Sequence, residues 1–181
     1  MARGRPLAKE SGQEPDEQRL VEAARKDPAR FADLYEINFE RVYAFIVRRV
    51  YLGNRVIEVI PIPGHDPVSL AFYDARTGIL LTGDTLYPGR LYIEDFPAYR
   101  ASVQRLVRYT AHKPVAHILG NHIEQTSTPY LDYPVGTKYQ PQEHELPLAR
   151  AHLLELDLAL EEMQSHPVRI ALRDFTVWPK P

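Results

Sequence analysis

The chain has 181 residues, enough for one ordinary domain or for a small domain with an appendage, and its 44% hydrophobic and 25% charged residues are in the normal range for globular proteins. It contains no cysteine, which excludes disulfides and thiolate metal sites. A net charge of −2 gives no electrostatic reason to expect a nucleic-acid partner. The sequence also lacks a secretory signal and an apolar run long enough to cross a membrane. These features predict a cytoplasmic protein in which any metal is held by His, Asp or Glu.

The first 50 residues are predicted to form two helices after a polar tail. Residues 1–15 are polar and contain Pro and Gly, which predicts a disordered tail. From residue 16 two amphipathic stretches follow, separated by Asp27-Pro28, a helix-start signal. The second stretch repeats apolar residues with the helical period: Phe31, Leu34, Tyr35, Phe39, Val42, Tyr43, Ile46 and Val50.

After Gly53-Asn54 the pattern changes to that of an α/β domain. Strands are predicted over residues 55–62, 69–74, 79–82, 114–119 and 168–177, and helices over 97–110 and 148–163. A four-residue turn ending at Gly78 joins the second strand to the third. We expect the first three strands to form an antiparallel meander. A helical crossover should then make the fourth strand parallel to the third.

Three residues with metal-binding side chains follow the ends of these strands. His65 comes after the first strand, Asp84 after the third and His122 after the fourth. The predicted topology brings these strand ends to one edge of the sheet, where α/β proteins bind their ligands. A glycine stands one or two positions before each of the three residues, which allows a tight turn there. Two imidazoles and a carboxylate suit a zinc-like cation.

The motifs around these residues resemble the C-terminal half of the metallo-β-lactamase superfamily. They are Pro63-Gly64-His65, the run LLTGDT at residues 80–85, and Gly120-Asn121-His122, within a region of about residues 51–181. The resemblance implies that His65 binds a first metal, that Asp84 bridges two metals and is catalytic, and that His122 binds the second. It further implies one or two zinc ions and hydrolysis of a small-molecule ester, amide or thioester.

The family's opening motif, His-x-His-x-Asp-His, does not occur in this sequence. Without it each ion keeps two protein ligands, whereas catalytic zinc usually has three. We therefore expect reduced zinc occupancy and doubtful hydrolytic activity. The first sheet of the αββα sandwich is missing as well. This predicts a partial fold, with one sheet, flanking helices and an uncovered face available for a homodimer contact.

Residues 16–50 resemble something else, the start of region 2 of an extracytoplasmic-function sigma factor. This resemblance implies an alternative function, a non-catalytic module that binds RNA polymerase or an anti-sigma partner. No helix-turn-helix candidate follows, so promoter binding is not expected. The abrupt join at Val50-Tyr51 indicates a fused or truncated chain.

Four further residues were weighed as functional candidates. His144 is a possible additional metal ligand. Arg90 and Tyr92, downstream of Asp84, are candidates for contacts with an anionic substrate, the alternative being a solvated loop. His117 lies inside a predicted strand and is interpreted as a packed core residue.

Overall fold

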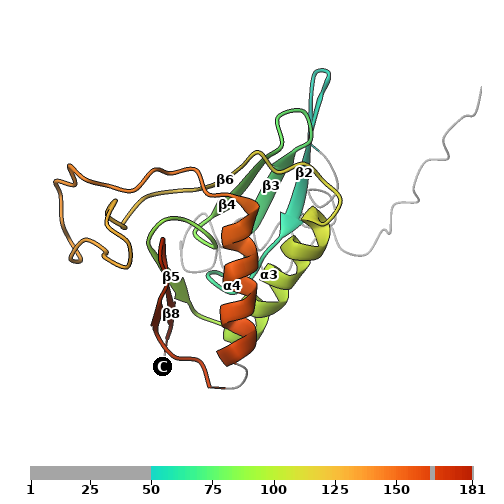
Figure 1. Cartoon of the computed structure of the whole chain (residues 1–181). Coiled ribbons are helices and arrows are strands. Elements are labelled where there is room, and N and C mark those ends of the chain that lie inside the picture. Colours follow the sequence, from blue (N-terminus) through green and yellow to red (C-terminus); the bar gives the residue numbers. More distant parts are fainter. Residues whose placement is uncertain (1–49, 164–165, 181) are drawn as a thin grey trace, which may run out of the picture. The chain divides into compact units, whose positions relative to one another are not determined.

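The computed structural model describes residues 50–163 and 166–180, which belong to a compact unit that spans Val47–Pro181. These residues form an α/β structure with two mixed sheets and two helices (Figure 1). The predicted tail and helix pair lie outside the described residues, apart from Val50. Their resemblance to a sigma factor therefore stays a prediction.

The larger sheet has the strand order β1-β2-β3-β4-β6. Its strands are β1 (Val50–Leu52), β2 (Arg55–Pro61), β3 (Leu70–Asp74), β4 (Ile79–Gly83) and β6 (His117–Gly120). Strands β1 to β4 pair antiparallel in succession, and β6 pairs parallel with β4. The predicted meander and crossover are confirmed. Val50 was expected to end a helix, but it lies in β1, where it pairs with Ile57 across the turn at Gly53-Asn54.

The turn between β3 and β4 is built around Asp74. Gly78, the last residue of the predicted turn, has a φ of 69°, in the left-handed region that glycine adopts readily. The Asp74 carboxylate accepts hydrogen bonds from the Thr77 hydroxyl at 2.6 Å and from the Arg76 backbone N–H at 3.1 Å, and it pairs with the Arg55 guanidinium. The hydrogen bond from Arg55, followed by that from Thr77, holds the pKa of this carboxyl well below its ordinary value.

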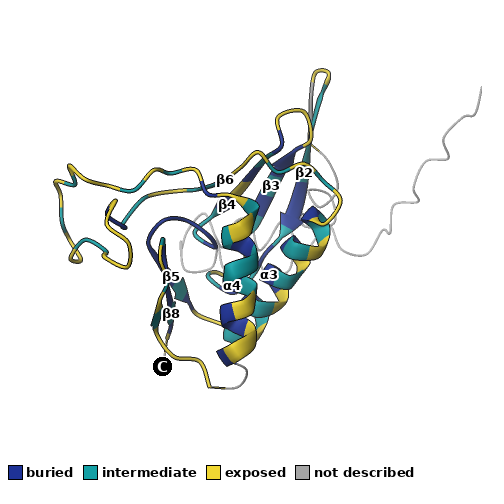
Figure 2. Cartoon of the chain, in the orientation of Figure 1, coloured by how far each residue is buried: buried dark blue, intermediate teal, exposed yellow. Residues whose placement is uncertain are grey.

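Helices α3 (Phe96–Thr110) and α4 (Arg150–Met163) form at the predicted places. Helix α3 begins after Asp95, whose side chain accepts from the Ala98 N–H at 2.9 Å, with a proline in its first turn. The two helices lie side by side and pack on one face of the larger sheet (Figure 1). The buried core joins inward residues of both helices to inward residues of the sheet, including Ala71, Tyr73, Leu80, Ile118, Tyr99, Val103, Leu106, Leu153, Leu156 and Leu160 (Figure 2).

The opposite face of the larger sheet is also apolar. Val59, Phe72, Leu81 and Leu119 are cross-strand partners on that face. Val59 is buried, whereas Leu81, near the middle of the sheet, keeps 44% of its surface exposed. The larger sheet is thus covered on one face by α3 and α4 and incompletely on the other, consistent with a partial sandwich.

The described residues also contain a second, three-stranded sheet, so the expectation of a single sheet was wrong. It has the order β5-β8-β7, formed by β5 (Arg90–Ile93), β7 (Ile170–Ala171) and β8 (Thr176–Pro179). The single strand predicted over 168–177 is in fact β7 and the first part of β8, joined by a turn. Strands of two to four residues are too short to show an alternating pattern.

No helix within residues 50–163 and 166–180 has the length and apolar character needed to span a membrane.

Candidate metal centre

Three strands of the larger sheet carry the predicted ligands at one edge. Strands β2, β4 and β6 run in the same direction, and His65, Asp84 and His122 follow their carboxyl ends. Asp84 Oδ1 lies 2.9 Å from His122 Nε2, and Asp84 Oδ2 lies 3.8 Å from His65 Nε2. The side chains are partly accessible, with 26% (His65), 34% (Asp84) and 47% (His122) exposed. The structure thus brings the three side chains together around the Asp84 carboxylate.

The loop that carries His65 is held by the segment before α3. The Gly64 carbonyl accepts hydrogen bonds from the backbone N–H groups of Glu94 at 2.9 Å and Asp95 at 3.0 Å. The Ser102 hydroxyl of α3 donates to the Pro63 carbonyl at 2.8 Å. The two residues before His65 are therefore fixed to α3 and to the segment that precedes it.

A backbone carbonyl orients the His65 ring. His65 Nδ1 lies 2.8 Å from the Tyr92 carbonyl oxygen, which can only accept a hydrogen bond, so Nδ1 carries the proton. In the neutral ring, Nε2 then presents a lone pair toward Asp84, and two acceptors face each other across 3.8 Å. A cation between them satisfies both. Metal-binding histidines commonly donate their second ring N–H to such a carbonyl.

The donor chemistry of this edge fits zinc, but the arrangement does not complete a metal site. Two ligands of a tetrahedral zinc ion lie roughly 3.4 Å apart, between the two distances measured around Asp84. Among the described residues, however, no group of three or more His, Asp or Glu side chains is arranged to hold a metal ion. The three residues offer two pairs of ligands that share one carboxylate, rather than a closed three-ligand site.

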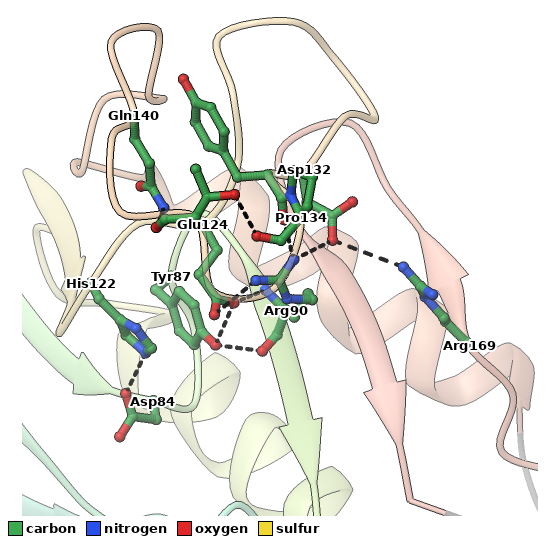
Figure 3. A network of polar contacts seen from close by, with 11 residues as sticks. Asp84, Tyr87, Arg90, His122, Glu124, Asp132, Pro134, Gln140 and Arg169 are labelled. Carbon is green, nitrogen blue, oxygen red and sulfur yellow. Dashed lines mark hydrogen bonds and ion pairs between the residues drawn. The ribbon is translucent and has the colours of Figure 1, made fainter.

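The ring of His122 lies against a buried tyrosine. The Tyr87 and His122 rings are stacked, with centroids 4.3 Å apart and an interplanar angle of 24°. The Tyr87 hydroxyl donates to the Arg90 carbonyl and lies 3.3 Å from Glu124 Oε2. Figure 3 shows Tyr87 between His122 on one side and Arg90 and Glu124 on the other. Sequence reasoning did not single out Tyr87 or Glu124, because neither belongs to a ligand motif.

Arg90 is buried, and its guanidinium is already paired. Arg90 Nη2 lies 3.1 Å from Glu124 Oε1, and Nη1 lies 2.8 Å from Asp132 Oδ2. Its side chain is 5% exposed. This geometry argues against both interpretations of Arg90 that the sequence left open, a contact with an anionic substrate and a solvated loop. Tyr92 contributes its carbonyl to His65, while its ring lies 5.5 Å from that of Trp178.

His144 belongs to a different cluster. His144 Nε2 lies 3.2 Å from Asp174 Oδ1, and His152 Nε2 lies 3.1 Å from Asp174 Oδ2. His144 Nδ1 lies 2.6 Å from the Glu145 carbonyl, so both of its ring nitrogens have protein partners. This arrangement leaves His144 no nitrogen for a metal beside Asp84.

His117 is exposed, so its interpretation as a core residue was wrong.

Comparison with known proteins agrees with the fold and with the strand-end motifs. The family model of the metallo-β-lactamase superfamily matches residues 15–145, well over half of the chain, and the chain belongs to this superfamily. Hydroxyacylglutathione hydrolase of Chelativorans sp. (strain BNC1) is 39% identical to the chain over 61 residues. The matched part is 32% of this chain and 24% of that protein, so the chain spans about a quarter of its curated relative.

Membership of this superfamily bears on the metal. Its members are typically zinc-dependent hydrolases. The matched stretch includes residues 16–50, yet none of the seven histidines of the chain precedes His65. The ligands that the opening motif supplies in the family therefore have no counterpart here.

Proposed function

We propose that the chain is a metallo-hydrolase domain that binds zinc at His65, Asp84 and His122 and, by itself, hydrolyses little. The observation that carries this proposal is the facing pair of acceptors, His65 Nε2 and Asp84 Oδ2, with the His65 proton held at Nδ1 by the Tyr92 carbonyl. At 3.8 Å the two atoms are too far apart for a hydrogen bond, whereas His144 Nε2 and Asp174 Oδ1 lie 3.2 Å apart, so a cation would fit between His65 and Asp84.

Each residue has a definite part in this proposal. His65 and Asp84 would hold a first ion, and Asp84 and His122 would hold a second. When bound, zinc supplies Lewis-acid polarisation of a substrate carbonyl. The Tyr92 carbonyl keeps the proton of His65 at Nδ1, so that Nε2 remains a donor to the ion.

Low activity follows from the number of ligands. Each ion has two protein ligands from this chain, and a catalytic zinc site usually has three plus water. Two side chains per ion would hold zinc less firmly than the three of a usual catalytic site. Zinc affinity and turnover are therefore both expected to lie well below those of a superfamily member with the full ligand set.

The relative's name suggests which substrate to test first. Hydroxyacylglutathione hydrolase is named for a thioester of glutathione, and the similar region covers 61 residues. We propose a thioester as the substrate class, and a hydroxyacylglutathione as the first compound to assay.

The test compares zinc binding by the full chain and by two double variants. Equilibrium dialysis followed by elemental analysis is run on the wild type, on His65→Ala/His122→Ala and on the control His112→Ala/His117→Ala. The control removes two exposed histidines outside the proposed site. We expect zinc to be retained by the wild type and the control and to be lost by His65→Ala/His122→Ala.

Two results would overturn the proposal. Equal zinc content in the wild type and in His65→Ala/His122→Ala would place the metal elsewhere or show that none is bound. Thioester turnover at the rate of an ordinary hydrolase, abolished by Asp84→Ala, would show that two ligands per ion suffice for catalysis.

A further inference from the structure

We propose that Tyr87 is a positioning residue for His122: the stacked tyrosine ring sets the plane of the imidazole, and a buried network around Arg90 holds the tyrosine. This inference deepens the proposed function, because it assumes that His122 serves as a metal ligand. The contacts on which it depends are present without any metal.

The stack explains how an exposed histidine is held in one orientation. The His122 side chain is 47% exposed, and the contacts found for its ring are the Asp84 carboxylate and the face of Tyr87. A single ion pair leaves an imidazole free to rotate about the contact. The Tyr87 ring, 4.3 Å away and inclined by 24°, restricts that rotation and keeps Nε2 directed at Asp84 Oδ1.

Tyr87 is itself fixed at its far end. Its hydroxyl donates to the Arg90 carbonyl, and Glu124 Oε2 lies 3.3 Å away. Glu124 in turn accepts from the Arg90 backbone N–H at 2.9 Å and pairs with the Arg90 guanidinium.

The anchor extends into the loop after β6. Arg90 Nη1 donates to Asp132 Oδ2 at 2.8 Å and also to the Tyr133 carbonyl. Asp132 has a longer contact with Arg169, at 3.8 Å (Figure 3). Because Arg90 and Asp132 are largely buried, this network resists movement more than an exposed salt bridge would. Arg90 thus serves the candidate metal centre through Tyr87.

Two glycines leave the space that Tyr87 occupies. A Cβ at Gly120 would lie 2.2 Å from the Tyr87 Cβ, and a Cβ at Gly89 would lie 2.5 Å from its ring. Both distances are well below a normal carbon–carbon contact of about 3.5–4 Å. The chain therefore has no side chain at the two points where one would displace Tyr87 from His122.

The test distinguishes the effect of the Tyr87 ring on His122 from the effect of the Tyr87 hydroxyl and from that of a general loss of stability. The variants are Tyr87→Leu, which removes the ring, Tyr87→Phe, which keeps it, and Tyr73→Leu as a matched control. Tyr73 is a second buried tyrosine with its own hydroxyl bond to a carbonyl, that of Pro114. Pro114 precedes β6, so this contact lies at the opposite end of that strand from His122. Zinc affinity and the proton resonances of the His122 ring are measured in the full chain.

We expect the His122 ring protons of the metal-free wild type to be shifted upfield by the Tyr87 ring current. Tyr87→Phe should keep this shift and an affinity close to that of the wild type. Tyr87→Leu should lose the shift and bind zinc about ten- to hundred-fold more weakly. Tyr73→Leu should lower thermal stability without changing the shift of the His122 ring protons or the zinc affinity.

The proposal is refuted if the wild type shows no upfield shift, or if Tyr87→Leu binds zinc as the wild type does. An equal loss of affinity in Tyr73→Leu would also refute it, because the effect would then be one of stability. The ring-current measurement needs no metal and no folded Tyr87→Leu variant. If the wild type binds no zinc, the proposed function fails, and the shift alone still decides whether Tyr87 holds His122.

Discussion

The replacement Gly120→Ala tests the packing beneath the candidate metal centre directly. The new Cβ would lie 2.2 Å from the Tyr87 Cβ and 2.9 Å from each of two backbone oxygens, those of Gly83 and Leu86. None of these atoms is the end of a flexible side chain, so no rotamer change can relieve the contact. The backbone of β4 or of the segment after it must move.

The cost follows from the size of that displacement. Overpacking of a buried site costs about 1–3 kcal/mol, and a clash with two backbone oxygens and a Cβ atom belongs at the upper end. About 3 kcal/mol corresponds to a fall in melting temperature of roughly 6–12 °C for a chain of this size. Because Asp84 follows β4 and His122 follows β6, the same movement should separate them and weaken zinc binding. Thermal unfolding and zinc dialysis on one preparation measure both effects.

Gly53→Ala is the matched control. Gly53 has a φ of 64° and nothing within 4 Å of an added Cβ, so the variant carries backbone strain without a clash. It should cost about 1 kcal/mol and leave zinc binding unchanged. If Gly120→Ala has the stability and zinc content of the wild type, the reasoning is refuted, because the short distances around the added Cβ would then not limit the packing beneath the candidate metal centre.

Three further outcomes follow from the described contacts. The pKa of Asp74 is depressed in the folded state by Arg55, so its contribution to stability is present above the unfolded pKa of about 3.9 and is lost as the pH falls through the folded value. Asp74→Asn should therefore flatten the decline in melting temperature below about pH 4, and an unchanged decline would contradict this. Asp174→Ala removes the acceptor shared by His144 and His152, and should cost about 1–3 kcal/mol in urea unfolding. A small hydroxamate should raise zinc affinity in the wild type by supplying missing ligands; no increase in dialysis would count against the two-ligand geometry.

Strands β2, β3, β4 and β6 of the larger sheet and both helices could be predicted because their signals are local, whereas β1 lies where a helix was expected to end. Each strand from β2 to β4 is an apolar run bounded by a turn, and α3 has a capping residue and a proline at its start. The second sheet could not be predicted. Strand β5 pairs in parallel with β8, more than 80 residues later in the chain, and neither strand is long enough to show a period. These short segments pair because of the way they pack in the folded core, which no local pattern in the sequence indicates.

The candidate ligands could be predicted for the same reason, since His65, Asp84 and His122 follow strand ends whose direction the topology determines. The roles of their neighbours could not. From the sequence, Arg90 is a cation in an expected loop near the site, which left an anionic substrate as one candidate partner. The structure places Arg90 in β5, and its partners Glu124 and Asp132 lie in a distant segment. Tyr92 was considered for its side chain, whereas its backbone carbonyl contacts His65. Every residue has a backbone carbonyl, so the sequence does not indicate which carbonyl accepts a hydrogen bond from His65.

The contacts that orient the candidate ligands all come from the described part of this chain. The Tyr92 carbonyl directs His65, and the stack with Tyr87 restrains His122. The network of Arg90 and Glu124 holds Tyr87. None of these contacts depends on the opening motif that the chain lacks. Under the proposed function, the chain is therefore short of ligands, while the orientation of those present is already set. Supplied ligands should accordingly raise zinc affinity, and loss of the Tyr87 ring should lower it about ten- to hundred-fold.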